Sequence, residues 1–199
     1  MRTLTRPSTA KCTMPLYISF LLSEPHYPSA CRLATLKNIS HDSVNRFLLR
    51  ERYTPKDLFE QAKAQLNLKG GVLSIDDSVL DKPYSHKMAL VSHFWSGKHH
   101  CSVKGINLIT LYYTDISGHH LPVNYRLYDK VEGKTKNDYF LEMLDEVILW
   151  GLTPSFVTGD SWYSATKNLK AIKNKGLSFM FALKSNRRVS LKKKEFMQK

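Results

Sequence analysis

The chain has 199 residues, and 42% of them are hydrophobic, which is enough for a folded core and excludes a wholly disordered protein. Lys and Arg outnumber Asp and Glu by 30 to 17, and the net charge of +13 favours polyanionic partners, above all nucleic acid. Three widely spaced cysteines indicate neither a disulfide framework nor a zinc knuckle. No apolar run approaches the ~20 residues of a membrane span, so we expect a cytoplasmic protein without a membrane partner.

The first part of the chain, residues 1–69, is predicted to be helical. Pro28, Ser40 and Pro55 are each placed to begin a short helix, as a proline in the first turn or as a capping serine. The first two helices are joined by a tight turn and fit a helix-turn-helix DNA-binding region, with Arg46 on the outer face of the second. An ordinary helical hairpin that packs against the main domain is the alternative.

The second part, residues 70–199, alternates between strand and helix patterns. The order is a strand, a hairpin of two strands, a helix, a strand, a helix and a strand, and it predicts an α/β fold with a mixed sheet and crossover helices. The segments are 72–75, 103–115, 121–128, 137–150, 155–158, 164–175 and 177–183.

Two aspartates follow two of the predicted strands, Asp77 after 72–75 and Asp160 after 155–158. In parallel sheets, functional groups gather at the carboxyl ends of strands. Two carboxylates are the usual protein contribution to a Mg²⁺ site that also binds phosphate and water. Basic segments flank a slightly acidic middle, residues 71–159, which suits a metal-binding centre between DNA-gripping ends. The alternative is that each aspartate only caps the element that follows it.

Several basic or aromatic residues are candidates for contact with DNA. The lysines could bind backbone phosphates, although solvated surface lysines are equally common. Trp162 and Tyr163, just after Asp160, could stack on an unpaired base or pack against the sheet. The arginines begin a basic run that continues through residues 192–194. These candidates are Lys104, Lys134, Lys136, Trp162, Arg187 and Arg188.

Five blocks of sequence, residues 74–83, 103–108, 122–127, 133–137 and 157–163, together resemble bacterial insertion-sequence transposases of the DDE superfamily. The likeness runs in order through about residues 17–190. It implies an RNase H-like catalytic domain of the retroviral integrase type, preceded by a small helical region. It also implies a Mg²⁺-dependent nuclease and strand transferase: water attacks the phosphodiester at a transposon end, and the freed 3′-hydroxyl attacks target DNA.

The resemblance also implies site residues and partners. Asp77 matches the first family aspartate and Asp160 the second; Asp76 is the alternative to Asp77, because neighbouring side chains on a strand point to opposite faces. The expected cofactor is Mg²⁺, for which Mn²⁺ could substitute. The expected partners are double-stranded DNA, as transposon ends and target, and a second copy of the chain on DNA, in a nucleoid-associated location.

The third family carboxylate is a glutamate in the pattern Tyr-x2-Arg-x3-Glu-x6-Lys, which this sequence lacks. Glu195 is the single acidic residue after Asp160, and it has no tyrosine or arginine at the required offsets. We therefore expect a truncated or frameshifted product that cleaves DNA poorly or not at all on its own. The alternatives are a non-catalytic DNA-binding fragment and an RNase H-like nuclease that is not a transposase.

Overall fold

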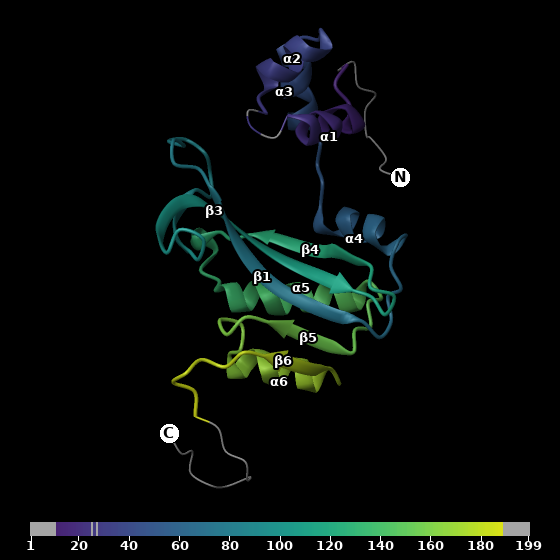
Figure 1. The fold of residues 1–199 in the computed structure, drawn as a ribbon, viewed down its shortest axis with the longest axis vertical. Helices are drawn as coiled ribbons and strands as arrows, with labels where there is room; N and C mark the ends of the chain where they lie inside the picture. The colour runs from purple at the N-terminus through teal and green to yellow at the C-terminus, as the bar shows by residue number, and fades with distance from the viewer. Residues whose placement is uncertain (1–10, 25, 27, 189–199) are drawn as a thin grey trace. The chain divides into compact units, whose positions relative to one another are not determined.

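A computed structural model of the chain describes residues 11–24, 26 and 28–188. These residues form two compact units, divided between Thr54 and Pro55 (Figure 1). No helix in these ranges is long and apolar enough to cross a membrane.

The smaller unit contains three short helices, α1 (Met14–Ser23), α2 (Ala30–Lys37) and α3 (His41–Arg50). They enclose a small core of Cys12, Phe20, Leu33, Val44 and Phe47.

The turn between α2 and α3 agrees with the prediction from the sequence. The side chain of Ser40 caps α3 by accepting a hydrogen bond from the backbone N–H of Asp42. Asn38 ends α2 in the left-handed conformation, with φ of 48°, which asparagine tolerates better than most residues. Arg46 is exposed on α3, with its Nε donating to the backbone oxygen of Asp42. Contact of this helix pair with DNA stays a prediction.

The larger unit is built on a mixed sheet, as predicted. The described residues contribute six strands to it. Strand β3 is antiparallel to β1, β2 and β4, whereas β5 lies parallel to both β1 and β6. The order across the sheet is β2-β3-β1-β5-β6, with β4 also paired to β3. The strands are β1 (Val72–Asp81), β2 (Ser92–Ser96), β3 (Cys101–Thr114), β4 (His120–Leu127), β5 (Phe156–Gly159) and β6 (Ser178–Phe181).

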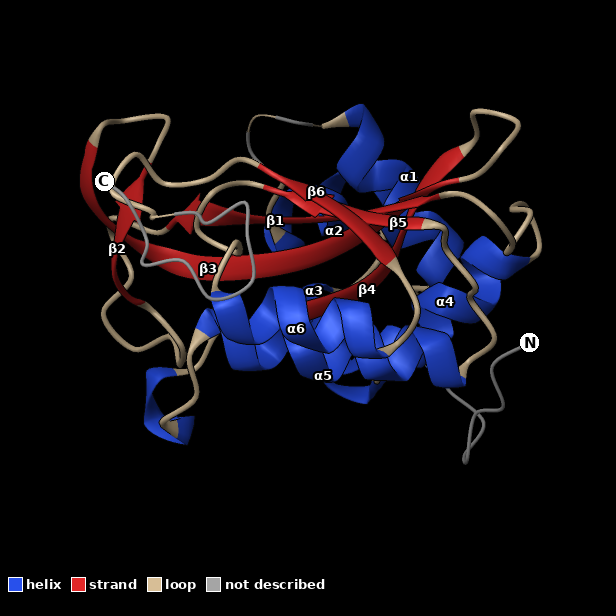
Figure 2. Ribbon diagram, turned by 90° about the horizontal axis from the view of Figure 1, so that it is seen from below, coloured by secondary structure: helices blue, strands red, loops and turns tan. Residues whose placement is uncertain are grey.

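Helices α4 (Pro55–Lys63), α5 (Lys136–Leu149) and α6 (Thr166–Asn174) contribute to one hydrophobic core with the sheet, and a short 3-10 turn, Lys130–Glu132, precedes α5. Figure 2 shows α5 and α6 together beneath the sheet. Side chains on one face of the strands meet the helices in this core, which leaves the opposite face open.

Helix α4 belongs to the larger unit, although the sequence analysis placed it in the N-terminal region that ends at residue 69. Its apolar stripe explains the difference, since Phe59 and Ala62 are buried in the core of the sheet. A periodic pattern shows which face of a helix is apolar, but it does not show which core that face joins.

Two further differences lie in the first half of the sheet. Strand β1 runs to Asp81 rather than ending before Asp76, because β3 pairs with it along its whole length, from Val72–Thr114 to Asp81–Gly105. Strand β2 lies in a segment for which no strand was predicted. Asp77 is therefore inside a strand and not at its end.

Candidate active site

The candidate site lies where the parallel pairing of β1 and β5 ends. The last matched pair is Ile75 with Gly159, and the next residues along the two strands are Asp76 and Asp160. Glycine is required here, because a Cβ at position 159 would lie 2.5 Å from Cγ2 and 3.0 Å from the carbonyl oxygen of Ile75. This close approach of the two backbones brings two carboxylates together beside the open end of β5.

The neighbouring aspartates of β1 leave the strand on opposite faces. Leu73 and Ile75 point into the core, and strand alternation puts Asp77 on their side. Asp76 is on the other face and is exposed, as is Asp160. Two residues that the sequence could not distinguish therefore have different surroundings.

Three donors converge on the carboxylate of Asp77. Its Oδ2 accepts hydrogen bonds from Nδ2 of Asn107 at 2.7 Å and from Nζ of Lys136 at 2.6 Å. Its Oδ1 accepts one from the hydroxyl of Tyr163 at 3.0 Å. The Asp77 side chain is 17% exposed. The lysine supplies a countercharge, and the three bonds fix the orientation of the carboxylate.

Lys136 occupies the first position of α5, where a positive charge is unfavourable beside the positive end of the helix dipole. The helix start is otherwise well formed: Thr135 and Asp138 make a reciprocal capping box. The ion pair with Asp77 explains how this lysine is tolerated. A residue that is unfavourable for its own helix, but is stabilised by a partner distant in the sequence, is often found at a functional site.

Two groups of the site, the carboxyl of Asp76 and the hydroxyl of Tyr163, have raised pKa values. Loss of water around the Asp76 carboxylate raises its pKa, and the nearby charges of Asp77 and Asp160 add to that increase. A hydrogen bond from the backbone N–H of Asp77 acts in the opposite direction. Burial, followed by the charge of Asp77, also raises the pKa of Tyr163, so its hydroxyl stays protonated and donates.

The segment after Asp160 shapes the remaining wall of the site. Oδ1 of Asp160 accepts a hydrogen bond from the backbone N–H of Trp162 at 2.8 Å. Trp162 remains 53% exposed, whereas the next residue, Tyr163, turns inward and is buried. One short turn thus places a carboxylate, an exposed indole and the hydroxyl that binds Asp77 in the same region.

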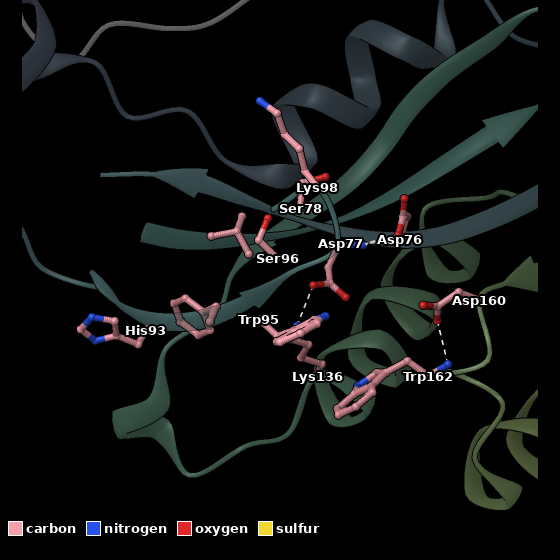
Figure 3. Close-up of a pocket in the computed structure, with 13 residues that line it drawn as sticks. Asp76, Asp77, Ser78, His93, Trp95, Ser96, Lys98, Lys136, Asp160 and Trp162 are labelled. Atoms are coloured by element: carbon pink, nitrogen blue, oxygen red, sulfur yellow. Dashed lines mark hydrogen bonds and ion pairs between the residues drawn. The ribbon is translucent and has the colours of Figure 1, made fainter. Parts of the chain in front are cut away.

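Asp76, Asp77, Asp160 and Trp162 line a pocket of about 710 Å³. Figure 3 shows the three aspartates around it, with Lys136, Trp95 and Trp162 among the other lining residues. Lys98 also lines the pocket, so both charge signs are present. Within the described ranges, no three His, Cys, Asp or Glu side chains are arranged to hold a metal ion by themselves.

The predicted DNA-contacting residues have different locations. Lys136 and Trp162 line the pocket. Lys104 is partly buried on β3, and Arg188 is exposed. Lys134 forms ion pairs with Glu132 and Glu142, and Arg187 hydrogen bonds to Thr166 and to the backbone oxygen of Ser164. Arg46 belongs to the smaller unit. Residues 192–194 and Glu195 lie outside the described residues.

The sequence analysis did not single out two residues of this region, Asn107 and Trp95. Asn107 is fully buried within the strand pattern of β3, and a buried asparagine among apolar residues is a recognisable signal. Tyr163 is buried, in agreement with the alternative of packing against the sheet, but its contact with Asp77 could not be predicted, because the two residues lie 86 positions apart. The alternation of β2, with Phe94 buried and Trp95 exposed, extends over a strand too short to give a clear signal in the sequence.

A family model described as DDE superfamily endonuclease matches residues 2–199. No curated protein matches the sequence.

Among solved structures, the piggyBac transposase synaptic complex with hairpin DNA is 14% identical, with a TM-score of 0.52, over 87% of this chain and 41% of that one. The Drosophila P element transposase strand transfer complex is 12% identical, with a TM-score of 0.42, over 81% and 35%. This chain therefore spans less than half the length of either transposase. The first likeness supports an RNase H-like fold, and the family match shows that the chain belongs to the DDE superfamily endonucleases.

Proposed function

We propose that the pocket is the metal and phosphodiester site of an insertion-sequence transposase, in which DNA is cleaved with Mg²⁺ or Mn²⁺. The observation that carries the proposal is the adjacency of Asp76 and Asp160 at the end of the parallel pairing of β1 and β5. Burial, and then the charges of Asp77 and Asp160, raise the pKa of Asp76. A divalent cation between Asp76 and Asp160 would relieve the repulsion between these two carboxylates.

Within the Asp76–Asp77 pair, we assign the ligand role to Asp76, although the sequence analysis favoured Asp77. Asp76 is exposed on the same side of the strand pairing as Asp160. The two oxygens of Asp77 already accept hydrogen bonds from Asn107, Lys136 and Tyr163. A cation at Asp77 would have to compete with the ammonium group of Lys136, and Asp77 is better suited to positioning that lysine.

The bound cation would activate the attacking oxygen and stabilise the leaving one. The residues of the chain have complementary tasks. Asp76 and Asp160 bind the cation, while Lys98 and Lys136 provide positive charge on the pocket wall for the phosphate groups of DNA. The duplex contacts predicted for Arg46, Lys104, Lys134, Arg187 and Arg188 are part of the same proposal, as are transfer of the 3′-end to target DNA and a second copy of the chain on DNA.

We expect the third carboxylate of the metal site to come from outside the described residues, since none of them completes the site with Asp76 and Asp160. Two carboxylates bind a cation more weakly and position it less precisely than three. Cleavage that depends on the two pocket carboxylates without a third should therefore be slow, and rapid, complete digestion by the purified wild-type chain would contradict this part of the proposal.

Nicking of supercoiled plasmid DNA tests the function, because one cut per molecule is visible on a gel. We expect slow nicking that requires Mg²⁺ or Mn²⁺, stops with EDTA and falls about 100-fold or more in Asp76→Asn and Asp160→Asn. Asp77→Asn should reduce nicking by about 10- to 100-fold, as expected for a residue that positions others.

Asp145→Asn is the matched control, because Asp145 is an exposed aspartate on α5 that does not line the pocket. Nicking that continues unchanged in Asp160→Asn would contradict the proposal. Cleavage of RNA–DNA hybrids in place of plasmid DNA would instead favour the alternative of an RNase H-like nuclease.

A further inference from the structure

The two exposed tryptophans of the pocket come from separate elements of the sheet. Trp95 is on β2 and is 68% exposed, and Trp162 follows β5 and is 53% exposed. The third tryptophan, Trp150, is partly buried and its ring centroid lies 5.3 Å from that of Phe59 in the core. Exposed tryptophans on one concave surface leave apolar area for a ligand to cover.

Trp95 is held outward by the packing of its neighbour. Phe94 is 7% exposed, its ring centroid lies 5.9 Å from that of Tyr128, and Nζ of Lys130 lies 4.7 Å from its centroid. With Phe94 anchored on one face of β2, alternation directs Trp95 to the other. The indole is thus presented from a paired strand and not from a free loop, so little entropy is lost when a ligand binds it.

Trp162 is held by a backbone hydrogen bond, and two lysine ammonium groups lie over its ring. Its N–H donates to Asp160, and Nζ of Lys184 lies 4.7 Å and Nζ of Lys136 5.9 Å from its ring centroid. Positive charge beside an exposed aromatic face matches the chemistry of a nucleotide, which carries a flat base next to a phosphate. An apolar peptide segment would complement the indoles but not the lysines.

We propose that Trp95 and Trp162 form a stacking site for unpaired DNA bases beside the acidic pair, so that the pocket receives single-stranded or locally opened DNA. A paired base hides its faces in the helix, and stacking on an indole requires that face to be free. This inference rests on the proposed function, because it specifies the form of DNA that the same pocket binds. It predicts that the strand to be cut is unpaired next to its scissile phosphate.

Binding to fluorescent oligonucleotides in EDTA tests the inference without any cleavage. We expect the wild-type chain to prefer single-stranded DNA over a strand of equal length and charge in which the bases are replaced by abasic residues. Trp95→Ala and Trp162→Ala should each weaken single-strand binding about 5- to 50-fold. Trp95→Phe and Trp162→Phe should recover most of the loss, because phenylalanine still offers an aromatic face.

Tyr112→Ala is the matched control, since Tyr112 is an aromatic residue 45% exposed on β3 that does not line the pocket. Circular dichroism should show every variant folded, because the replaced side chains are exposed. Equal affinity for abasic and base-containing strands, or alanine variants that bind like the wild type, would overturn the inference. Plasmid nicking reports on the metal site separately: alanine variants that bind normally while nicking still depends on Asp160 would leave the proposed function intact.

Discussion

Two acidic regions of the larger unit, the turn after β3 and the pocket, stabilise their carboxylates in opposite ways. At the turn between β3 and β4, the Asp115 side chain is 2% exposed and accepts hydrogen bonds from the backbone N–H groups of Asn67, Ser117 and His119. The bond from Asn67 is the largest cause of its lowered pKa. In the pocket, the pKa of Asp76 is instead raised.

The difference separates a structural carboxylate from those that we propose to bind a cation. The charge of Asp115 is stabilised by the fold itself, so its turn needs nothing more. The charges of Asp76 and Asp160 are unfavourable to each other in the free protein, and a cation would stabilise both. When two like charges repel each other in the ligand-free protein, binding of an oppositely charged ligand stabilises the folded state.

The largest effect on stability should come from Asp115→Ala. The change removes the acceptor of three backbone N–H groups, and unsatisfied donors in a partly buried turn are costly. We expect the Tm to fall by about 5 °C or more, with an unchanged response of Tm to Mg²⁺. Thermal melting followed by circular dichroism measures both, with Asp145→Ala as the exposed control. A Tm equal to that of the wild type would show that Asp115 does not stabilise the fold.

Two buried tyrosines, one that contacts the pocket and one that does not, allow the same comparison. The Tyr163 hydroxyl donates to Asp77, and the Tyr113 hydroxyl accepts from the backbone N–H of Gly71. We expect Tyr163→Phe and Tyr113→Phe each to lower the free energy of unfolding by about 1–2 kcal/mol, measured by urea denaturation. Tyr163→Phe alone should also slow plasmid nicking, because it frees one oxygen of Asp77. Equal nicking by the two variants would show that the Asp77 contacts are purely structural.

We expect Asp76→Asn to change the Tm less than Asp115→Ala does, and to raise it. Removing one of two repelling charges stabilises the metal-free protein, and we expect the Tm in EDTA to rise by roughly 1–2 °C. The same variant should lose the increase in Tm that Mg²⁺ or Mn²⁺ produces in the wild type. Differential scanning calorimetry with and without metal distinguishes the two effects. A decrease in Tm in EDTA would indicate that Asp76 supports the fold.

The smallest effect is on the pH dependence of unfolding. The lowered pKa of Asp115 contributes stability above its unfolded pKa of about 3.9, and this is lost as the pH falls below that value. The raised pKa of Asp76 has the opposite sign, because ionisation is less favourable in the folded state and stability is lost as the pH rises past about 3.9. Urea unfolding between pH 3 and 6 should show a shallower rise in Asp115→Asn and a steeper one in Asp76→Asn, and identical slopes would contradict both assignments.

Much of the fold was accessible from the sequence, because the relevant signals are local. The periodic apolar positions of α5, the capping serine of α3 and the alternating residues of β3 each depend on near neighbours along the chain. The extent of β1 was not accessible in this way. Its second half is polar, and it remains a strand because β3 pairs with it as far as Asp81.

The site could be predicted in its location but not in its details. Asp160 and the pair formed by Asp76 and Asp77 were found from their positions after apolar strands. Which member of the pair faces Asp160 depends on the register of β1 with β5, and register is a property of two strands that are distant in sequence. The contacts of Lys136 and Tyr163 with Asp77 have the same origin, since they join residues 59 and 86 positions apart.

Direct measurement of cation binding is the test closest to the central claim, that Asp76 and Asp160 share a divalent ion. Free Mn²⁺ has a strong electron paramagnetic resonance signal that is lost on binding, so titration of the purified chain reports the number and affinity of bound ions without any cleavage. We expect the wild type and Asp115→Asn to bind Mn²⁺ alike, and Asp76→Asn and Asp160→Asn to lose that binding. Unchanged Mn²⁺ binding in both of these pocket variants would contradict the account.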